Sequence, residues 1–340
     1  MFRKSNYFLP FALAVYGLIA TGNCLSQVPD LSSRGGSSSE RNLSEWLVRT
    51  HEASRRRAYT GTFVVSAGNA MASARLWHVC DGAQQVERVE TLTGAPRTTL
   101  RRNDEVVTFV PESRVAVHER RESLGLFPAL LQSQASHLGE FYSLRQAPQG
   151  DRVAGFETDV FDLMPRDNLR FGYRIWSEKK TGLMVKLQTL DADQRVLEQV
   201  AFSELQLDAP VRIDQLLKQM KARDGYTVQH NKLLPTTAQS QGWQLKTAVP
   251  GFAPVSCHVR EEISPVRQAP PMQWVFSDGL ASVSVFAEPF DAQRHGRESS
   301  QATGATHSYS RRHGDHWLTV VGEVPPQALR QFAQQIERTR

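Results

Sequence analysis

The sequence predicts a β-rich α+β protein with two domains, a larger one followed by a smaller one. Short runs of β-branched and aromatic residues, separated by turn residues, recur along most of the 340-residue chain. This pattern lapses over residues 208–240, which we therefore predict to be a linker. About 100 residues follow the lapse, enough for a domain with its own core. A hydrophobic fraction of 40% is typical of globular domains.

The first residues are predicted to form a secretory signal peptide, residues 1–26. Arg3 and Lys4 precede an apolar run over residues 7–20, and this run is too short to span a bilayer comfortably. A signal peptide of this kind predicts export to a compartment that permits disulfides. No later segment is apolar over the length that a membrane crossing needs, so the mature chain is expected to be soluble.

Cleavage of the signal peptide is expected after Gly22 or after Ser26, and the cleavage site decides whether Cys24 remains in the mature chain. Cys24 lacks the small preceding residue of a lipid-attachment motif, which argues against an anchor. Cys80 and Cys257 remain in an oxidising compartment but fall in different predicted domains. They can form a disulfide only if the domains approach closely, and two free thiols are the alternative.

The charge of the chain is mildly basic. The formal net charge is +5, and removal of Arg3 and Lys4 with the signal would leave about +3. This balance, together with export, argues against nucleic acid as a partner. Local basic spots at residues 55–57 and at Arg311 and Arg312 can meet acidic peptides or lipid phosphates, or can simply be solvated surface.

The larger domain, residues 42–207, is predicted to begin with a helix. Residues 27–41 are rich in Ser and Gly and are expected to be disordered. Asn42 and Glu45 resemble a capping box, and the apolar side chains after them repeat with helical spacing over about residues 43–57.

Strands of an antiparallel meander are expected to follow this helix. Leu124–Leu138 interrupts their two-residue period and predicts a short helix, or a lid, after Pro128. The predicted strands are Tyr59–Ser66, Ala74–Cys80, Gln85–Leu92, Glu105–Val110, Arg114–His118, Glu140–Gln146, Arg152–Met164, Phe171–Ser177, Leu183–Leu190 and Val196–Leu205.

The smaller domain, residues 241–340, is predicted to be an antiparallel sheet with a C-terminal helix. Residues 277–279 mark a strong hairpin turn, and Pro325 and Pro326 precede a helix with one apolar face. The predicted strands are Trp243–Thr247, Ser256–Arg260, Met272–Phe276, Leu280–Phe286, Ser308–Arg312 and His316–Val321.

The chain lacks the sequence motifs of common enzymes. It has no phosphate loop, nucleophile elbow, HExxH or CxxC motif, and we predict no catalytic residue and no cofactor. His313, Asp315 and His316, with His307 upstream, could converge on a metal ion. A solvated hairpin turn around Gly314 explains the same residues and is preferred, so no metal is predicted.

Two pairs of acids could in principle serve as catalytic carboxylates. These are Asp159 with Asp162 and Asp191 with Asp193. Without a cleft that shifts their ionisation, such pairs are expected to contribute only to solubility.

Large apolar side chains gather in the first domain. Most must be core, but a curved antiparallel sheet that holds a helix can also take an acyl chain, with about 0.8 kcal/mol contributed by each buried methylene. Residues predicted to line such a lipid-binding concavity, with plain core packing as the alternative, are Trp46, Phe63, Phe127, Leu130, Leu131 and Trp176.

Motifs in both predicted domains resemble the RseB/MucB family. In the first domain they are residues 59–64 (YTGTFV), 87–89 (ERV), 127–131 (FPALL), 152–155 (RVAG), 171–176 (FGYRIW) and 181–183 (TGL). In the second they are residues 275–286 (VFSDGLASVSVF), 308–312 (SYSRR) and 320–325 (VVGEVP). The resemblance covers nearly all of the chain past residue 42, and the motifs occur in the same order.

This resemblance implies a periplasmic negative regulator of the sigma-E (AlgU-like) envelope-stress response. Its large domain would be a half-open antiparallel β-barrel similar to the lipoprotein carriers LolA and LolB. It would bind the periplasmic domain of an RseA/MucA-like anti-sigma factor, protect that factor from site-1 proteolysis, and release it when lipopolysaccharide or another amphiphile binds. Such a switch needs a ligand with different affinities for two states rather than a catalytic group.

Two alternatives to this regulator remain at the level of sequence. A periplasmic lipid or lipoprotein carrier would share the first domain, but the appended second domain favours a protein partner. An envelope enzyme is the third reading. Arg311 and Arg312 are predicted to face the partner because of their charge and their place near a strand end. The sequence is also compatible with a homo-oligomer.

Overall fold

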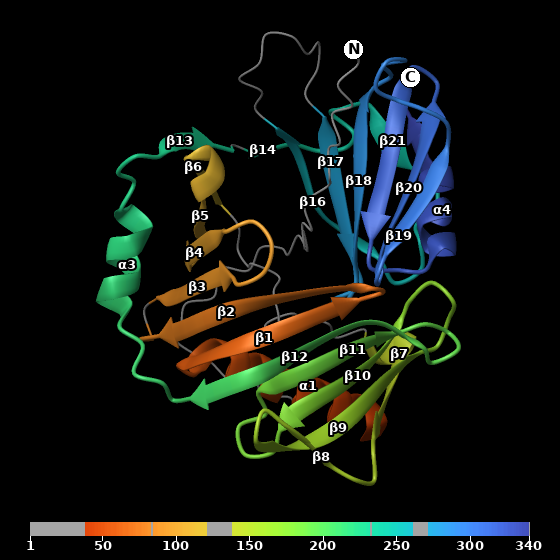
Figure 1. The fold of residues 1–340 in the computed structure, drawn as a ribbon. Coiled ribbons are helices and arrows are strands. Elements are labelled where there is room, and N and C mark those ends of the chain that lie inside the picture. Colours follow the sequence, from red (N-terminus) through yellow and green to blue (C-terminus); the bar gives the residue numbers. More distant parts are fainter. Residues whose placement is uncertain (1–37, 83, 121–137, 232, 261–270, 340) are drawn as a thin grey trace.

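The computed structural model describes residues 38–82, 84–120, 138–231, 233–260 and 271–339 (Figure 1). Two large sheets, one in each predicted domain, account for most of the ordered backbone, and helices are few. The predicted β-rich α+β architecture is therefore confirmed. Among the described residues, no helix combines the length and the apolar character needed to cross a membrane.

The large sheet is built from the first part of the chain and from one strand of the predicted linker. Its elements are α1 (Ser38–Arg56), β1 (Tyr59–Ala67), β2 (Ala70–Cys80), β3 (Gln85–Thr91), β4 (Thr98–Arg102), β5 (Glu105–Val110), a 3₁₀ turn (Pro111–Ser113), β6 (Val115–Arg120), α2 (Leu138–Phe141), β7 (Tyr142–Gln146), β8 (Asp151–Val153), β9 (Phe156–Pro165), β10 (Gly172–Glu178), β11 (Met184–Leu190), β12 (Val196–Leu207), α3 (Ile213–Lys221) and β13 (Thr227–His230).

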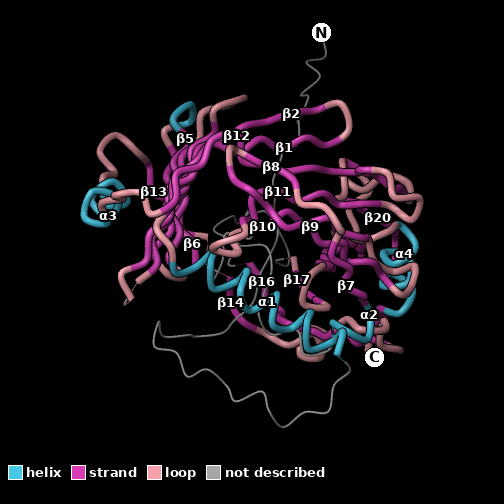
Figure 2. The backbone as a smooth tube through the Cα atoms, turned by 90° about the horizontal axis from the view of Figure 1, so that it is seen from below, coloured by secondary structure: helices cyan, strands magenta, loops and turns pink. Residues whose placement is uncertain are grey.

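The strands of the large sheet follow one another in the order β13-β6-β5-β4-β3-β2-β1-β12-β11-β10-β9-β7, with β8 paired to β9. All pairs are antiparallel except β13 with β6. Figure 2 shows the sheet arching around α1, and α3 packs on the opposite face against β3 and β4. The main apolar cluster thus lies between α1 and the concave face.

The small sheet is formed by seven strands in the order β14-β16-β17-β18-β21-β20-β19, and α4 packs on one face of it. Its elements are β14 (Leu233–Pro235), β15 (Trp243–Leu245), β16 (Ala253–Arg260), β17 (Met272–Ser277), β18 (Ser282–Pro289), β19 (Ser299–Thr303), β20 (Thr306–His313), β21 (His316–Gly322), α4 (Pro326–Gln335) and β22 (Ile336–Arg338), which pairs with β15.

The start of the first helix corrects the sequence prediction. Helix α1 begins at Ser38, four residues before the predicted cap at Asn42, so residues 38–41 are helical rather than disordered. The prediction placed the cap where the apolar period begins. Polar residues can extend a helix beyond its buried stripe, because intrinsic propensity alone penalises most of them little. The rest of the predicted disordered segment lies outside the described residues.

The strand predictions also need correction. The run predicted as Arg152–Met164 is a hairpin, because Ala154 and Gly155 adopt positive φ angles of 49° and 87° and turn the chain between β8 and β9. Strands β4 and β19 were missed. Both consist mainly of polar residues, so they lack the alternation by which the other strands were found.

The range 208–240 is more than the predicted linker. Leu216 and Met220 of α3 are buried against the large sheet, β13 extends that sheet, and β14 is the edge strand of the small one. The connection therefore belongs structurally to both domains. The helix and hairpin predicted for the small domain are confirmed.

Candidate functional site

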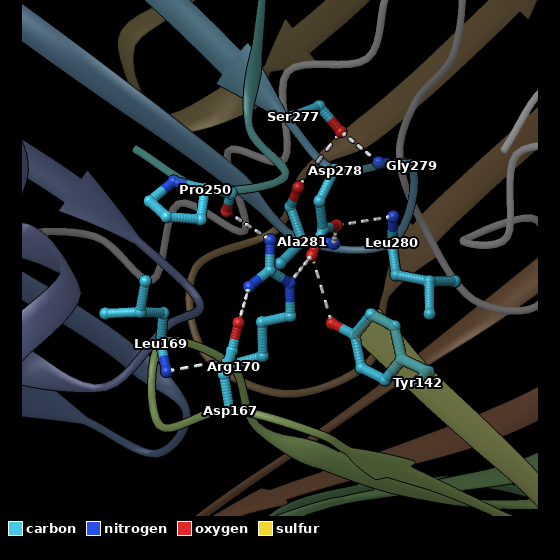
Figure 3. Close-up of polar contacts among 10 residues, drawn as sticks. All are labelled: Tyr142, Asp167, Leu169, Arg170, Pro250, Ser277, Asp278, Gly279, Leu280 and Ala281. Atoms are coloured by element: carbon cyan, nitrogen blue, oxygen red, sulfur yellow. Dashed lines mark hydrogen bonds and ion pairs between the residues drawn. The ribbon is translucent and has the colours of Figure 1, made fainter. Parts of the chain in front are cut away.

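The two domains meet through a buried ion pair between Arg170 and Asp278 (Figure 3). Arg170 comes from the loop between β9 and β10, and Asp278 lies at the tip of the β17–β18 hairpin. Arg170 Nε donates to Asp278 Oδ2 over 2.7 Å, and the exposure of both side chains is 0%. Removal of both charges from water is costly, and the attraction between the two groups offsets that desolvation cost.

The Arg170 guanidinium is held from several directions. It forms a second ion pair with Asp167 and donates to the carbonyl oxygen of Pro250 over 2.7 Å. Its central carbon lies 4.3 Å from the ring centre of Phe141 and 4.7 Å from that of Phe252. These rings come from different domains, so the planar cation lies between apolar surfaces of both.

Asp278 shapes its own hairpin while it binds Arg170. Its Oδ1 accepts hydrogen bonds from the backbone N–H groups of Leu280 and Ala281, at 2.9 and 2.8 Å. Tyr142 donates its hydroxyl to Oδ2 over 3.2 Å. Burial raises the pKa of Asp278, and the N–H donors and Arg170 oppose that rise. The junction is thus a polar network with a full set of partners.

A second contact between the domains brings two acids together. Glu198 of β12 accepts a hydrogen bond from the N–H of Ala305, in the turn between β19 and β20, over 3.4 Å. Burial, aided by the nearby charge of Glu198, raises the pKa of Glu323 to about 7. Burial also raises the pKa of Glu198 itself. Near neutral pH this part of the junction therefore exchanges protons.

Trp46 and Phe63 occupy the apolar interior of the large domain. Trp46, on α1, packs on Phe161 of β9 with ring centres 5.0 Å apart, and Phe63, on β1, meets the edge of Phe202. The strand registers place Phe161 and Phe63 on the same concave face of the sheet. Both predicted residues are core side chains here, with exposures of 8% and 4%.

Two polar atoms in this interior lack hydrogen-bond partners among the described residues. They are Nε1 of Trp46 and Oγ1 of Thr50, which are four residues apart on the buried face of α1. An unsatisfied buried donor or acceptor costs about 1–3 kcal/mol. The concave face therefore combines apolar rings with unused hydrogen-bonding capacity.

Trp176 lies on the opposite face of the large sheet from Trp46 and Phe63. It pairs with Lys186 and Val160, and its Nε1 donates to Asp151 Oδ2 over 3.0 Å. Lys186 Nζ lies 4.1 Å from the centre of its ring. Trp176 belongs to the same apolar cluster as Trp46 and Phe63, but its side chain leaves the sheet on the face away from α1. The other predicted lining residues, Phe127, Leu130 and Leu131, lie outside the described residues.

Arg311 and Arg312 are neighbours on β20, so their side chains project from opposite faces of the strand. Arg311 lies beside His313, with Nη2 3.3 Å from Nδ1. Arg312 is exposed, stacks over Phe290 at 4.0 Å and donates to the carbonyl of Gly314. The two guanidinium groups do not form one patch on a single face, and their predicted role in partner binding stays a prediction.

The histidines of the small domain are used in local packing. His307 Nδ1 lies 2.9 Å from the Val324 carbonyl, and His313 and His316 both pack on Trp243. Within the described ranges, no group of three or more His, Cys, Asp or Glu side chains could hold a metal ion.

One acid of the predicted pairs, Asp162, and the two cysteines can be located in the structure. Asp162 forms ion pairs with Arg145 and Arg174, and the pKa of Asp162 lies below its ordinary value, because these hydrogen-bonded cations outweigh the opposing effect of burial. Among the described residues, no disulfide joins Cys80 to Cys257.

The junction residues Arg170 and Glu323 were not predicted from the sequence. Asp278 was noted only as part of a turn. Its partner Arg170 is 108 positions away, and no periodicity relates the two. The one available signal was a polar hairpin tip whose acid sits between strongly apolar strands.

These features define a class: β-rich proteins of two domains whose sheets are fastened by a buried ionic junction and spanned by a shared connection. Comparison with known proteins identifies the family of the chain. The family model of the MucB/RseB N-terminal domain matches residues 42–220, and the family model of the MucB/RseB C-terminal domain matches residues 237–337. The chain belongs to the MucB/RseB family.

Relatives and a solved structure agree with this assignment. The chain is 30% identical over 293 residues to the sigma factor AlgU regulatory protein MucB of Pseudomonas aeruginosa, covering 84% of this chain and 87% of the relative. It is 24% identical to the sigma-E factor regulatory protein RseB of Salmonella typhimurium, with coverages of 86% and 89%. A crystal structure of MucB in complex with MucA(peri) superposes with a TM-score of 0.67 at 28% identity, over 87% of this chain and 99% of that one.

Proposed function

We propose that this protein is a periplasmic regulator of sigma-E-type transcription. It binds the periplasmic region of a membrane anti-sigma factor, protects it from site-1 proteolysis, and releases it when lipopolysaccharide or a related amphiphile binds. The observation that carries the proposal is that both family domains are present, in order, over nearly the whole described chain. The predicted signal peptide supports a periplasmic location.

Binding of an anti-sigma factor is supported by the relatives. A similar MucB was crystallised with MucA(peri), and that structure aligns over both domains of this chain. The small domain supports the same view, because a lipid carrier has no need of a second sheet fastened to the first by Arg170 and Asp278. A fixed relation between two domains can present one composite surface to a partner.

Binding of an amphiphile is supported by the concave face of the large domain. Apolar rings such as those of Trp46 and Phe161 suit acyl chains, and the unpaired Trp46 N–H and Thr50 hydroxyl can bond to polar ester or headgroup atoms. Satisfying these atoms would favour the lipid-bound state specifically. A ligand that binds one state better than another shifts the balance between them.

The experiment that tests this proposal is a pull-down of the mature protein by the periplasmic segment of the anti-sigma factor, with and without lipopolysaccharide. We expect retention without lipid and loss of retention with it. Protection of the segment from the site-1 protease should follow the same pattern. Failure to retain the protein at all would contradict partner binding, and indifference to lipopolysaccharide would contradict the switch.

Thr50→Val separates lipid binding from stability. The variant keeps the shape of the side chain and removes an unpaired hydroxyl, so it should raise the free energy of unfolding by about 1 kcal/mol. It should also weaken lipopolysaccharide binding, measured by fluorescence titration. Thr60→Val is the matched control, because its hydroxyl donates to the Leu76 carbonyl and its side chain leaves β1 on the face opposite the buried Tyr59 and Phe63. This control should leave lipid binding unchanged.

A further inference from the structure

Two histidines face each other where the connecting segment joins the large sheet. His118 is on β6 and His230 ends β13, and the two are directly paired in the parallel ladder between these strands. Figure 1 shows β13 beside β6 at the edge of the large sheet, immediately before the chain crosses to β14 of the small sheet. Any bond between these side chains therefore fastens the connection to the first domain.

The geometry of the pair is unusual for two imidazoles. Nδ1 of His118 lies 3.2 Å from Nδ1 of His230, and the ring planes are nearly perpendicular, at 86°. On its other side, His118 Nε2 lies 2.9 Å from Oε1 of Glu105 on β5. An ionised carboxylate only accepts hydrogen bonds, so His118 Nε2 carries the proton. The lone pair of His118 Nδ1 then points toward His230.

This arrangement has the features of half a metal site. Imidazole nitrogens bind Zn²⁺ at about 2.0–2.1 Å, and two of them in a tetrahedral shell are separated by about 3.3 Å. The observed separation of 3.2 Å is close to that value. Metal-bound histidines commonly donate their other N–H to a carboxylate, which fixes the ring and makes the ligating nitrogen more basic. Glu105 stands in that position.

We propose that His118 and His230 bind a divalent transition-metal ion of the zinc and copper class through their Nδ1 atoms. Glu105 orients His118, and water completes the coordination, because no third His, Cys, Asp or Glu joins the pair among the described residues. The side chain of His230 is exposed and that of His118 is 22% exposed, so an ion can reach both. Bound metal would clamp β13 to β6 and so restrain the segment between the domains.

A second histidine pair in the chain is a poorer candidate and serves as an internal control. His313 and His316 are paired across the β20–β21 hairpin. The guanidinium of Arg311 lies beside His313, at 3.3 Å, and a fixed positive charge there opposes a cation. Arg120, the cation two residues along from His118, is neutralised by an ion pair with Asp104.

The proposal is tested by calorimetric titration of the untagged, metal-stripped mature protein with ZnCl₂ at neutral pH. We expect one Zn²⁺ per chain, and at least a tenfold loss of affinity in His230→Gln. Because His230 is exposed, this variant should keep the fold. Glu105→Gln should weaken binding about tenfold, as loss of a carboxylate partner does at other metal-bound histidines. The double variant His313→Gln, His316→Gln should bind as the unmodified protein does.

Hydrogen exchange adds a structural readout. Zn²⁺ should slow exchange of the amides of residues 227–230 in the unmodified protein and leave it unchanged in His230→Gln. The proposal would be overturned by absence of Zn²⁺ binding, by equal affinity in His230→Gln, or by binding that leaves β13 unprotected. It does not depend on the anti-sigma factor, so it can fail while the proposed function stands.

Discussion

The contact between the domains has two parts that differ in charge. Arg170 and Asp278 attract each other in a fully buried network, whereas Glu198 and Glu323 bring like charges to the same interface. The first part fixes the relation of the domains at every pH at which both groups are ionised. The second part opposes it once both acids have lost their protons. One interface thus combines a permanent attachment with a contact that depends on pH.

The largest predicted effect is at the attractive part. Asp278→Ala leaves the Arg170 guanidinium buried without its main partner. Because removal of one partner of a buried ion pair is strongly destabilising, we expect the free energy of unfolding to fall by about 3–5 kcal/mol. Urea unfolding measures it. Asp278→Asn is the matched control, because its amide oxygen can still accept the bonds from Leu280 and Ala281. It should lose less, and a loss under about 1 kcal/mol in Asp278→Ala would contradict the junction's role.

An intermediate effect is predicted at the repulsive part. The pKa of Glu323 is about 7 in the folded protein and 4.5 ordinarily. Below pH 4.5 the carboxyl is protonated in both states, so it costs nothing. Between pH 4.5 and 7 the folded state holds a proton that the unfolded state releases, and stability falls as pH rises; above pH 7 the cost is constant.

Glu323→Gln removes this pH-dependent cost. The variant should match the unmodified protein near pH 4.5 and exceed its free energy of unfolding by about 1–3 kcal/mol at pH 8. Thermal unfolding across that range checks the prediction. Glu157→Gln changes an exposed acid and should leave the pH profile unchanged. Equal stability of Glu323→Gln and the unmodified protein at pH 8 would argue against a partly buried contact between like charges.

The smallest effect separates close contact from backbone strain at the same interface. Gly304 has a φ of 58°, and a Cβ there would lie 2.7 Å from the Cβ of Ala67 and 2.8 Å from Oε2 of Glu198. Gly314 has a φ of 60° but open space around it. Both changes to Ala strain the backbone by about 1 kcal/mol, so Gly304→Ala should cost about 1 kcal/mol more than Gly314→Ala. Equal losses in urea unfolding would mean that the domains are not in close contact there.

The sequence predicted those parts of the molecule that follow from local patterns. Alternating β-branched runs revealed most strands, and the Ser277–Gly279 turn and the last helix were found in place. Strands β4 and β19 were missed because their residues are mainly polar and do not alternate with apolar ones. Sequence gives no register between distant segments, so the meeting of Arg170 with Asp278 was beyond it.

One error in the candidate site was avoidable. Phe171–Ser177 was predicted as a strand, and strict alternation along it puts Trp176 on the face opposite Tyr173 and Ile175. The structure has this arrangement, with Trp176 bonded to Asp151 away from Trp46. The lining residues of the lipid-binding concavity were predicted from the size of their side chains, without regard to the face of the strand on which each side chain lies. Trp46 and Phe63 do meet at the concave face, because Trp46 packs from α1 on Phe161, which shares that face with Phe63.

The most direct test of a regulator that holds and releases its partner is equilibrium binding. Fluorescence anisotropy of a labelled periplasmic segment of the anti-sigma factor, titrated with mature protein at increasing lipopolysaccharide, gives the Kd as a function of lipid. The account predicts a Kd that rises with lipid, and the segment should weaken lipid binding by the same factor. Absence of binding, or a Kd that lipid leaves unchanged, would contradict it.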